Sequence, residues 1–293
     1  MKLTGICCVA LAAALSVFSC ACKKEPSAPA SQWTNLLDDS LARWDKFIGV
    51  PYYDVDLPGY PKGDGMNGTP IGLNNDPLLV FKVERQDNAP VLHISGQIYG
   101  GLSTKEPYGD YHFKTEFKWG ERKYAPRLNA KHDNGILYHT YGAHGWFWNV
   151  WMASQEFQVQ EGDMGDYFAL GPAIDIRATY KTADGETDWI YDTAAPAIHF
   201  GHGAPAGRVR RGANNEKAHG EWNTLELICL GSKSMHIVNG KVVMVLENSR
   251  VRTDTSGFVP LTAGKIQIQS EGAEAWYRNM QIRQITEIPA EYR

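Results

Sequence analysis

At the centre of the chain stands the stretch SQEFQVQEGDMGDY, residues 154–167. Polar and apolar side chains alternate from Glu156 onward, which is typical of a β-strand with one packed face and one polar face. Glu156 and Gln158 then share the polar face, while Phe157 faces the core. Glu161 is polar where the alternation requires an apolar residue, and a β-bulge would turn it onto the face of Glu156. The stretch therefore predicts two carboxylates on one face of a strand.

Residues 1–19 indicate an export signal. Lys2 precedes an apolar run, residues 6–18, that is too short to span a membrane. Ser19-Cys20 follows and resembles the lipobox of bacterial lipoproteins, in which the cysteine carries the lipid; ordinary cleavage nearby, with Cys22 as a second candidate, is the alternative. We expect an exported lipoprotein of the bacterial cell envelope, in the periplasm or at the outer membrane, held to the membrane only by the lipid on Cys20.

The remaining chain divides into a polar tether, residues 20–31, and a single domain, residues 32–293. A net charge of -4 argues against nucleic acid as a partner. Nine Trp, fourteen Tyr and twenty-nine Gly favour short strands joined by turns. Only Cys22 and Cys229 remain beyond the signal and the lipidated cysteine, so we expect neither a disulfide scaffold nor a cysteine-based metal site.

The domain shows many short alternating segments separated by turn signals. The clearest are residues 111–118, residues 222–230 and the hairpin of residues 235–246, whose Asn239-Gly240 pair favours a type I′ turn. This pattern predicts an all-β fold, an antiparallel two-sheet β-sandwich of the jelly-roll type, with long loops at residues 51–77 and 199–219. The segment of residues 32–47 fits either a short helix or an edge strand.

The spacing Glu156-x-Gln158-x-x-Glu161 resembles the Glu-x-Asp-x-x-Glu signature of glycoside hydrolase family 16, in which a bulged strand presents a nucleophile and an acid. Gln158 replaces the aspartate of that signature. Without that charge the pKa of a neighbouring general acid is harder to keep raised.

A wider set of segments, in order along the domain, resembles the 3-keto-disaccharide hydrolase domain family. The segments are Tyr108–His112, Glu116–Gly120, Asn134–His139, Glu156–Gln158, Gly165–Tyr167, Gly220–Asn223, Val238–Lys241, Gly264–Gln269, Glu271–Gly272 and Arg278–Ile282. The resemblance implies a concanavalin-like jelly roll and cleavage of glycosides already oxidised at C3 of the sugar, with an oxidised glycoside as the partner.

This chemistry needs a base, an acid and a stabiliser of negative charge. A ketone at C3 acidifies the C2 proton, so that elimination expels the aglycone from C1 and water then adds to the enone. No glutamate nucleophile is required. The replacement of the signature aspartate by Gln158 therefore matters less for this reaction than for a retaining hydrolase. Two other functions stay open, a retaining β-glycanase of the family 16 type and a non-catalytic carbohydrate-binding module.

The candidate catalytic residues lie on or beside the opening stretch. Glu156 and Glu161 are the acid and base in unassigned order, His139 is a proton shuttle or metal ligand, and Lys118 is an oxyanion partner. The candidate substrate-binding residues are Gln158 for sugar hydroxyls, Trp148 and Trp151 for stacking on the ring, and Tyr138.

Asp163 and Asp166 lie in a glycine-flanked acidic turn. They are candidates for binding calcium or a catalytic transition metal, the alternative being a plain Asp/Gly turn. The cofactor is otherwise unknown from sequence.

Overall fold

The computed structural model describes residues 32–183, 185–204, 206–254 and 257–293. The expected signal and tether, with the proposed lipidation site Cys20, lie outside the described residues. Within the described ranges, no helix has the length and apolar character needed to cross a membrane.

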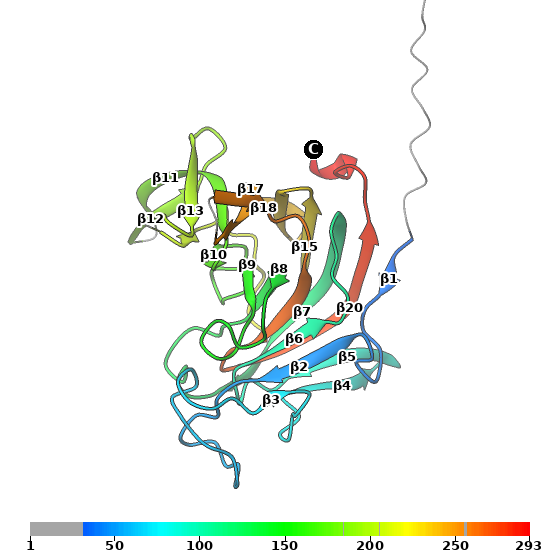
Figure 1. Cartoon of the computed structure of the whole chain (residues 1–293). Helices are drawn as coiled ribbons and strands as arrows, with labels where there is room; N and C mark the ends of the chain where they lie inside the picture. The colour runs from blue at the N-terminus through cyan, green and yellow to red at the C-terminus, as the bar shows by residue number, and fades with distance from the viewer. Residues whose placement is uncertain (1–31, 184, 205, 255–256) are drawn as a thin grey trace, which may run out of the picture. The chain divides into compact units, whose positions relative to one another are not determined.

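The strands of the described residues form two antiparallel sheets that face each other (Figure 1). The twelve-stranded sheet has the order β12 (Glu186–Tyr191), β11 (Ala173–Ala183), β17 (Lys241–Thr253), β16 (Lys233–Val238), β15 (Asn223–Leu230), β7 (Tyr111–Lys123), β20 (Ala273–Gln284), β5 (Ala89–Ile94) and β4 (Phe81–Gln86), with β1 (Thr34–Asn35), β13 (Ala197–Gly201) and β18 (Gly257–Pro260) paired to β20, β11 and β17. The eight-stranded sheet has the order β14 (Arg208–Val209), β10 (Tyr167–Leu170), β9 (Ala153–Gln158), β8 (Gly135–Tyr141), β19 (Lys265–Ser270), β6 (Gly100–Thr104), β2 (Trp44–Ile48) and β3 (Gly72–Leu73).

Strand β7 shows why these segments are strands. Phe113 and Phe117 are fully buried, whereas Lys114, Glu116 and Lys118 between and beyond them are partly exposed. A two-residue repeat of this kind suits a strand with one side in the core and one side in water.

The main core lies between the two sheets. The twelve-stranded sheet contributes Phe117, Leu227 and Tyr277, and the eight-stranded sheet contributes Ile136, Phe157 and Ile268, all of them in one cluster of buried side chains. The predicted all-β, antiparallel two-sheet β-sandwich of jelly-roll type is confirmed.

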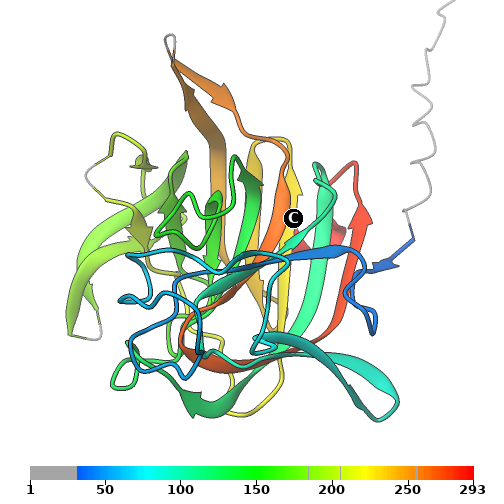
Figure 2. The same cartoon turned by 60° about the horizontal axis from the view of Figure 1, so that its bottom comes forward.

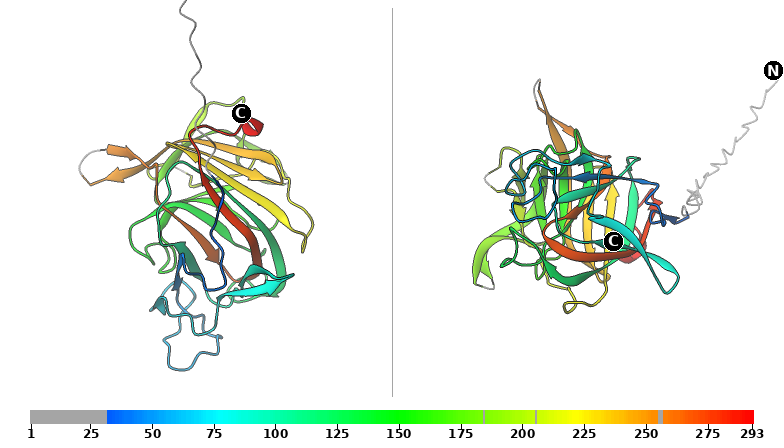
Figure 3. Two further views of the ribbon diagram at one scale, coloured as in Figure 1. Left: turned by 90° about the vertical axis from the view of Figure 1, so that its right-hand side faces the viewer. Right: turned by 90° about the horizontal axis from the view of Figure 1, so that it is seen from below.

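The segments left open by the sequence are also resolved. Residues 32–47 contain β1 and β2 and no helix. Residues 51–71 run as a long loop at one end of the sheets, and β18 with the end of β17 projects as a hairpin (Figures 2 and 3). A short 3₁₀ helix, η1 (Ala290–Tyr292), follows β20.

The β-bulge predicted at Glu161 is wrong. Phe157 pairs with Ile136, and the same register continues as the amide of Glu161 donates to the carbonyl of His132 over 3.0 Å. Because no residue is added, Glu161 stays on the face opposite to Glu156. The irregularity lies instead in β8, between Tyr138 and Tyr141.

Candidate active site

Glu156 lies on the face of the eight-stranded sheet that points away from the core, here named the outer face. Because Phe157 packs between the sheets, Glu156 and Gln158 point to the other side of β9. Leu137 of β8 and Phe168 of β10 are the cross-strand partners of Glu156. The carboxyl is therefore flanked by apolar side chains, and only 4% of the residue is exposed.

A row of polar side chains crosses the outer face just beyond the strand ends. Asp133 precedes β8, Glu271 follows β19 and Tyr99 precedes β6. The registers of these paired strands, extended by a few residues, place the three side by side. Nη2 of Arg127 lies 2.5 Å from Oε1 of Glu271 and also contacts Oδ2 of Asp133. Gln160 donates a hydrogen bond of 2.6 Å to Asp133.

Gly135 provides the space that lets Glu156 approach this row. A Cβ atom at Gly135 would lie 2.3 Å from Oε1 of Glu156 and 2.4 Å from Oε1 of Gln269. Both side chains therefore fold over the glycine. The carboxyl of Glu156 comes close enough to Asp133 and Glu271 for their charges to raise its pKa. We refer to the four charged residues that meet here as the carboxylate cluster: Asp133, Glu156, Glu271 and Arg127.

Burial raises the pKa of Glu156, and the charges of Glu271 and Asp133 raise it further, whereas Arg127 lowers it. Burial also raises the pKa of Asp133, again helped by Glu271. One guanidinium does not balance three carboxylates, so the cluster retains a proton at a higher pH than isolated carboxyls do. A protonated carboxyl beside an ionised one is the arrangement that general acid–base catalysis requires.

Several buried polar atoms of this region have no hydrogen-bond partner among the described residues. They are Oδ1 of Asp133, Nε of Arg127 and Oε1 of Gln269. A buried polar atom without a partner costs about 1–3 kcal/mol. Such atoms are rare in cores, and these three belong to the carboxylate cluster or to the neighbouring Gln269.

Aromatic rings lie on the outer face beside the cluster. Trp151 stacks on Tyr99 with ring centroids 5.8 Å apart, and its Nε1 donates to the carbonyl of Gly100 over 2.9 Å. The ring of Trp148 lies 5.8 Å from Trp151 and 4.7 Å from Phe147, and 47% of Trp148 is exposed. An exposed ring held by other rings is suited to stack on the apolar face of a sugar.

Three of the predicted substrate-binding residues lie on or under this surface. Gln158 points to the outer face, where its Oε1 accepts from the amide of Val159. Trp148 offers its ring to solvent, but Trp151 is 1% exposed and supports the rings of Tyr99 and Trp148 instead of offering a face of its own.

Tyr138 does not belong to this surface. It is fully buried between the sheets, where its hydroxyl lies 2.9 Å from Oγ of Ser234 and 3.2 Å from Nε2 of His236. The structure corrects its assignment to substrate binding, because even-numbered positions at this end of β8 face the core.

His139 is also separated from the carboxylate cluster. It lies where β8 is irregular, its φ is 49°, and its ring packs near Tyr111 and Tyr138 of the core. Burial lowers the pKa of His139 to about 4, so the ring is neutral. The local irregularity turns His139 inward, and the structure does not support its pairing with Glu156.

Lys118 lies on the far side of the sandwich. It projects from the solvent face of β7, with Nζ 5.0 Å from the ring centre of Trp222 and 6.0 Å from that of Trp276. Phe117, its neighbour, fills the core between Lys118 and the eight-stranded sheet. Lys118 therefore does not reach the outer face that carries Glu156, which corrects its assignment as an oxyanion partner.

Asp163 and Asp166 are neutralised by cationic side chains. Nη1 of Arg211 lies 3.0 Å from Asp166 and Nη2 of Arg208 lies 3.1 Å from it. Lys131 Nζ lies 2.6 Å from Asp163. Carboxylates that already face three cations have no excess charge for calcium, so the structure does not support the predicted ion site at this turn.

Glu161 lies between two histidines. His132 Nδ1 is 2.8 Å from Oε2 and His219 Nδ1 is 2.9 Å from Oε1 of Glu161. Burial acts to raise the pKa of Glu161, but the hydrogen bonds from both histidines lower it overall. Glu156 and Glu161 thus belong to different groups of side chains.

The site residues that the sequence analysis missed are Tyr99, Arg127, Asp133 and Glu271. Asp133-Asn134-Gly135 reads as a turn, and Glu271 stands in a short family-like segment with no catalytic signature. Each contributes only after β6, β8 and β19 have paired. Polar residues just outside the alternating segments are the sequence signal that could have identified Asp133 and Glu271.

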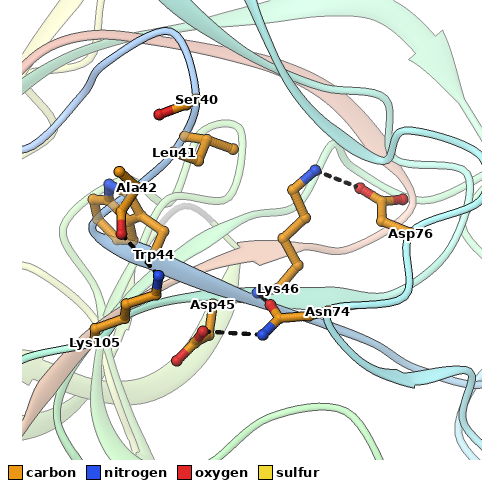
Figure 4. Close-up of a pocket in the computed structure, with 9 residues that line it drawn as sticks. All are labelled: Ser40, Leu41, Ala42, Trp44, Asp45, Lys46, Asn74, Asp76 and Lys105. Atoms are coloured by element: carbon orange, nitrogen blue, oxygen red, sulfur yellow. Dashed lines mark hydrogen bonds and ion pairs between the residues drawn. The ribbon is translucent and has the colours of Figure 1, made fainter.

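A separate surface pocket of about 370 Å³ lies around β2 (Figure 4). Its charged side chains pair with their neighbours: Lys46 lies 3.2 Å from Asp76, Asn74 donates to Asp45 over 3.1 Å, and Lys105 donates to a backbone carbonyl over 2.8 Å. These pairs serve the local structure, and the carboxylate cluster remains the better candidate for chemistry.

The chain is similar to several solved structures. A candidate glycosyl hydrolase from Parabacteroides distasonis ATCC 8503 has a TM-score of 0.48 and 17% identity, covering 87% of this chain and 100% of that one. A second from the same organism has a TM-score of 0.46 and 14% identity over 86% of this chain and 94% of that one. A β-glucanase of Bacillus licheniformis has a TM-score of 0.39 and 12% identity over 87% of this chain and 98% of that one.

The comparison with curated protein sequences found no match. The family model described as the 3-keto-alpha-glucoside-1,2-lyase-like domain matches residues 32–283, which is nearly all of the described chain. The resemblance drawn from ordered sequence segments is confirmed, and it supports a carbohydrate-active function. The chain therefore belongs to the 3-keto-alpha-glucoside-1,2-lyase-like domain family.

Proposed function

We propose that the protein cleaves glycosides whose sugar carries a ketone at C3, by elimination followed by hydration. The observation that carries the proposal is the carboxylate cluster, in which Glu156 folds over Gly135 toward Asp133, Arg127 and Glu271. Family membership gives independent support for the substrate class.

The reaction is balanced without a covalent intermediate. A base takes the proton from C2, the electron pair becomes a C1–C2 double bond, and the C1–O bond breaks while an acid protonates the leaving oxygen. Water then adds at C1 and a proton returns to C2. The net result is hydrolysis of the glycosidic bond.

The cluster supplies each role from this chain's own residues. Burial raises the pKa of Glu156, so this residue keeps its proton and gives it to the leaving oxygen. Asp133 takes the C2 proton through Oδ1, which has no hydrogen-bond partner among the described residues. Arg127, whose Nε is likewise unpaired, donates to the oxygen at C3 as negative charge develops there.

The aromatic surface holds the sugar against the cluster. Trp148 stacks on the ring face and Gln158 donates to a hydroxyl from the same face of the sheet as Glu156. Tyr99, which stands in the polar row and stacks on Trp151, lies beside the bound sugar and gives it one orientation.

The two alternatives receive different support. A retaining glycanase built on Glu156 and Glu161 requires both carboxyls on one face about 5 to 5.5 Å apart, but the unbroken register places them on opposite faces. A carbohydrate-binding module is favoured by the exposed rings of Trp146 and Trp148 and stays as the second candidate.

One experiment separates these functions. The protein is incubated with a 3-keto-glycoside and with the unoxidised parent glycoside, in heavy water and with and without chelator. We expect cleavage of the oxidised sugar alone, with deuterium gained at C2. Cleavage of the parent would support the glycanase, and saturable binding without cleavage would leave the binding module.

Variants test the assigned residues in the same assay. Glu156→Gln should lower kcat about 10²- to 10⁴-fold, the usual contribution of general acid–base catalysis. Glu247→Gln, a change at an exposed glutamate on β17, is the matched control. Full activity of Glu156→Gln would contradict the assignment.

The N-terminal sequence supports a proposal for where the protein acts. We propose that the protein is exported and anchored to the bacterial envelope by a lipid on Cys20. Cys20→Ala should move the protein from the membrane fraction to the soluble fraction, and an unchanged distribution would contradict the anchor.

A further inference from the structure

Three side chains outside the carboxylate cluster meet at one point. His132, Glu161 and His219 each offer one ligand atom, and these atoms all lie within 4.8 Å of one another. The two Nδ1 atoms approach different oxygens of the same carboxylate, at 2.8 and 2.9 Å. Two imidazoles and a carboxylate form a donor set typical of divalent transition metals.

The three residues come from separate segments. His132 precedes β8 and Glu161 follows β9, and the two are opposite each other in the extended register of these strands. His219 comes from the long loop between β14 and β15. A ligand held by all three would tie this loop to the end of the eight-stranded sheet.

The surroundings point to a cation. His132 is 9% exposed, and among the described residues its Nε2 has no hydrogen-bond partner, so the ring is held through Nδ1, which lies 2.8 Å from Glu161. Nε2 of His219 lies 3.8 Å from the carboxylate of Glu121. A histidine that binds a metal usually donates its other N–H to such a carboxylate. Glu216, which accepts from the amide of Gly162 over 2.8 Å, adds a further acidic group nearby.

We propose that His132, Glu161 and His219 bind one divalent transition-metal ion, with zinc as the probe. The ion is a structural brace and takes no part in the reaction. It holds the residues next to Asp133 of the polar row and its hydrogen-bond partner Gln160, since Asp133 follows His132 and Gln160 precedes Glu161 in the chain. This site is independent of the proposed substrate, and its residues His132 and Glu161 point to the face opposite to Glu156.

The competing arrangement is a metal-free clamp in which both imidazoles donate hydrogen bonds to Glu161. It would give the same side-chain positions. Titration of the full-length protein with zinc chloride, followed by calorimetry, distinguishes the two. We expect one zinc ion for each chain and a melting temperature that rises with zinc concentration, because a ligand that binds only the folded state stabilises it.

Variants locate the ion. His219→Ala and His132→Ala should each weaken zinc binding at least about tenfold, because losing even a hydrogen-bond partner of a metal ligand costs about 10- to 100-fold in affinity. His202→Ala, a change at an exposed histidine in the loop between β13 and β14, is the matched control and should bind zinc as the wild type does. A cobalt-substituted sample should show no sulfur-to-metal charge-transfer band, which excludes Cys20 and Cys22 as the ligands.

Two results would overturn the proposal: no binding of zinc, or zinc binding that is equal in wild type, His219→Ala and His132→Ala. Activity is measured separately on the 3-keto-glycoside. Zinc binding without activity would contradict only the proposed function. Activity without zinc binding would contradict only the metal site.

Discussion

Glu156 folds over Gly135 so closely that a methyl group on the glycine would lie 2.3 Å from the carboxyl oxygen. The two residues belong to neighbouring strands, β8 and β9, and Gly135 pairs with Gln158. Glu156 therefore reaches the polar row diagonally, across a position where only a hydrogen atom fits. Because Gly135 has no side chain, the carboxyl of Glu156 can occupy this position.

Gly135→Ala should displace Glu156 and lower kcat/KM on a 3-keto-glycoside about 100-fold, since a shift of about 1 Å in a reacting group has an effect of this size. Crowding should also reduce the free energy of unfolding by about 1–3 kcal/mol. Gly109→Ala is the control, because a Cβ there meets nothing closer than 3.7 Å. Equal activity of the two variants would show that Glu156 does not depend on this space.

The stability of Glu156→Gln should depend less on pH than that of the wild type. Burial raises the pKa of Glu156 in the folded state above the ordinary value of 4.5. The folded state then binds the proton more tightly than the unfolded state, so stability falls as the pH rises from about 4.5 through the folded-state pKa. Removing the carboxyl removes this loss.

The measurement is urea unfolding at about pH 5 and about pH 8, where the unfolded-state carboxyl is ionised. The difference between the two free energies of unfolding should be smaller in Glu156→Gln than in the wild type. An identical difference would mean that Glu156 ionises in the folded protein as easily as it does in water.

Asp166→Asn should destabilise the protein by about 3–5 kcal/mol, because it leaves the buried guanidinium of Arg211 and that of Arg208 without their main partner. Asp188→Asn, at a more exposed carboxylate 3.7 Å from Arg208, should cost less than about 1 kcal/mol. Added calcium should leave the wild-type unfolding midpoint unchanged. A calcium-dependent rise that Asp166→Asn abolishes would restore the ion site expected from the sequence.

Trp148→Ala should raise KM for a 3-keto-glycoside about two- to tenfold and leave kcat within about twofold, because one aromatic contact contributes about 0.5–1.5 kcal/mol. Tyr180→Ala removes another exposed ring, 58% exposed on β11, and serves as the control. Steady-state kinetics check the prediction, and equal KM values for the two variants would place sugar binding elsewhere.

The fold could be predicted because it depends on local alternation. Phe113 and Phe117 on β7, and Phe157 on β9, each sit in a two-residue repeat that is visible in the sequence. Asn239 and Gly240 both have positive φ in the structure, as their turn signal predicts.

The site could be predicted only in part, because its members are distant in sequence. Glu156 and Gln158 lie on a strand whose polar face can be recognised in the sequence. Asp133 and Glu271 meet only through the pairing of β8 with β19, which alternation does not specify. Local signals also give no position for a bulge, which the sequence placed at Glu161 and the structure shows in β8.

The register that pairs His132 with Glu161 is unbroken. Along β9 and its extension, residues an even number of positions apart therefore share one face, and residues an odd number apart lie on opposite faces. Glu156 and Glu161 are five positions apart, an odd interval, so the two acids lie on opposite faces of the sheet. Inserting a single residue between them would turn the second acid toward the first and away from its histidines. The family 16 signature has the same interval of five and places both acids on one side by a bulge, so the presence or absence of one bulge, and not the spacing itself, distinguishes the two arrangements.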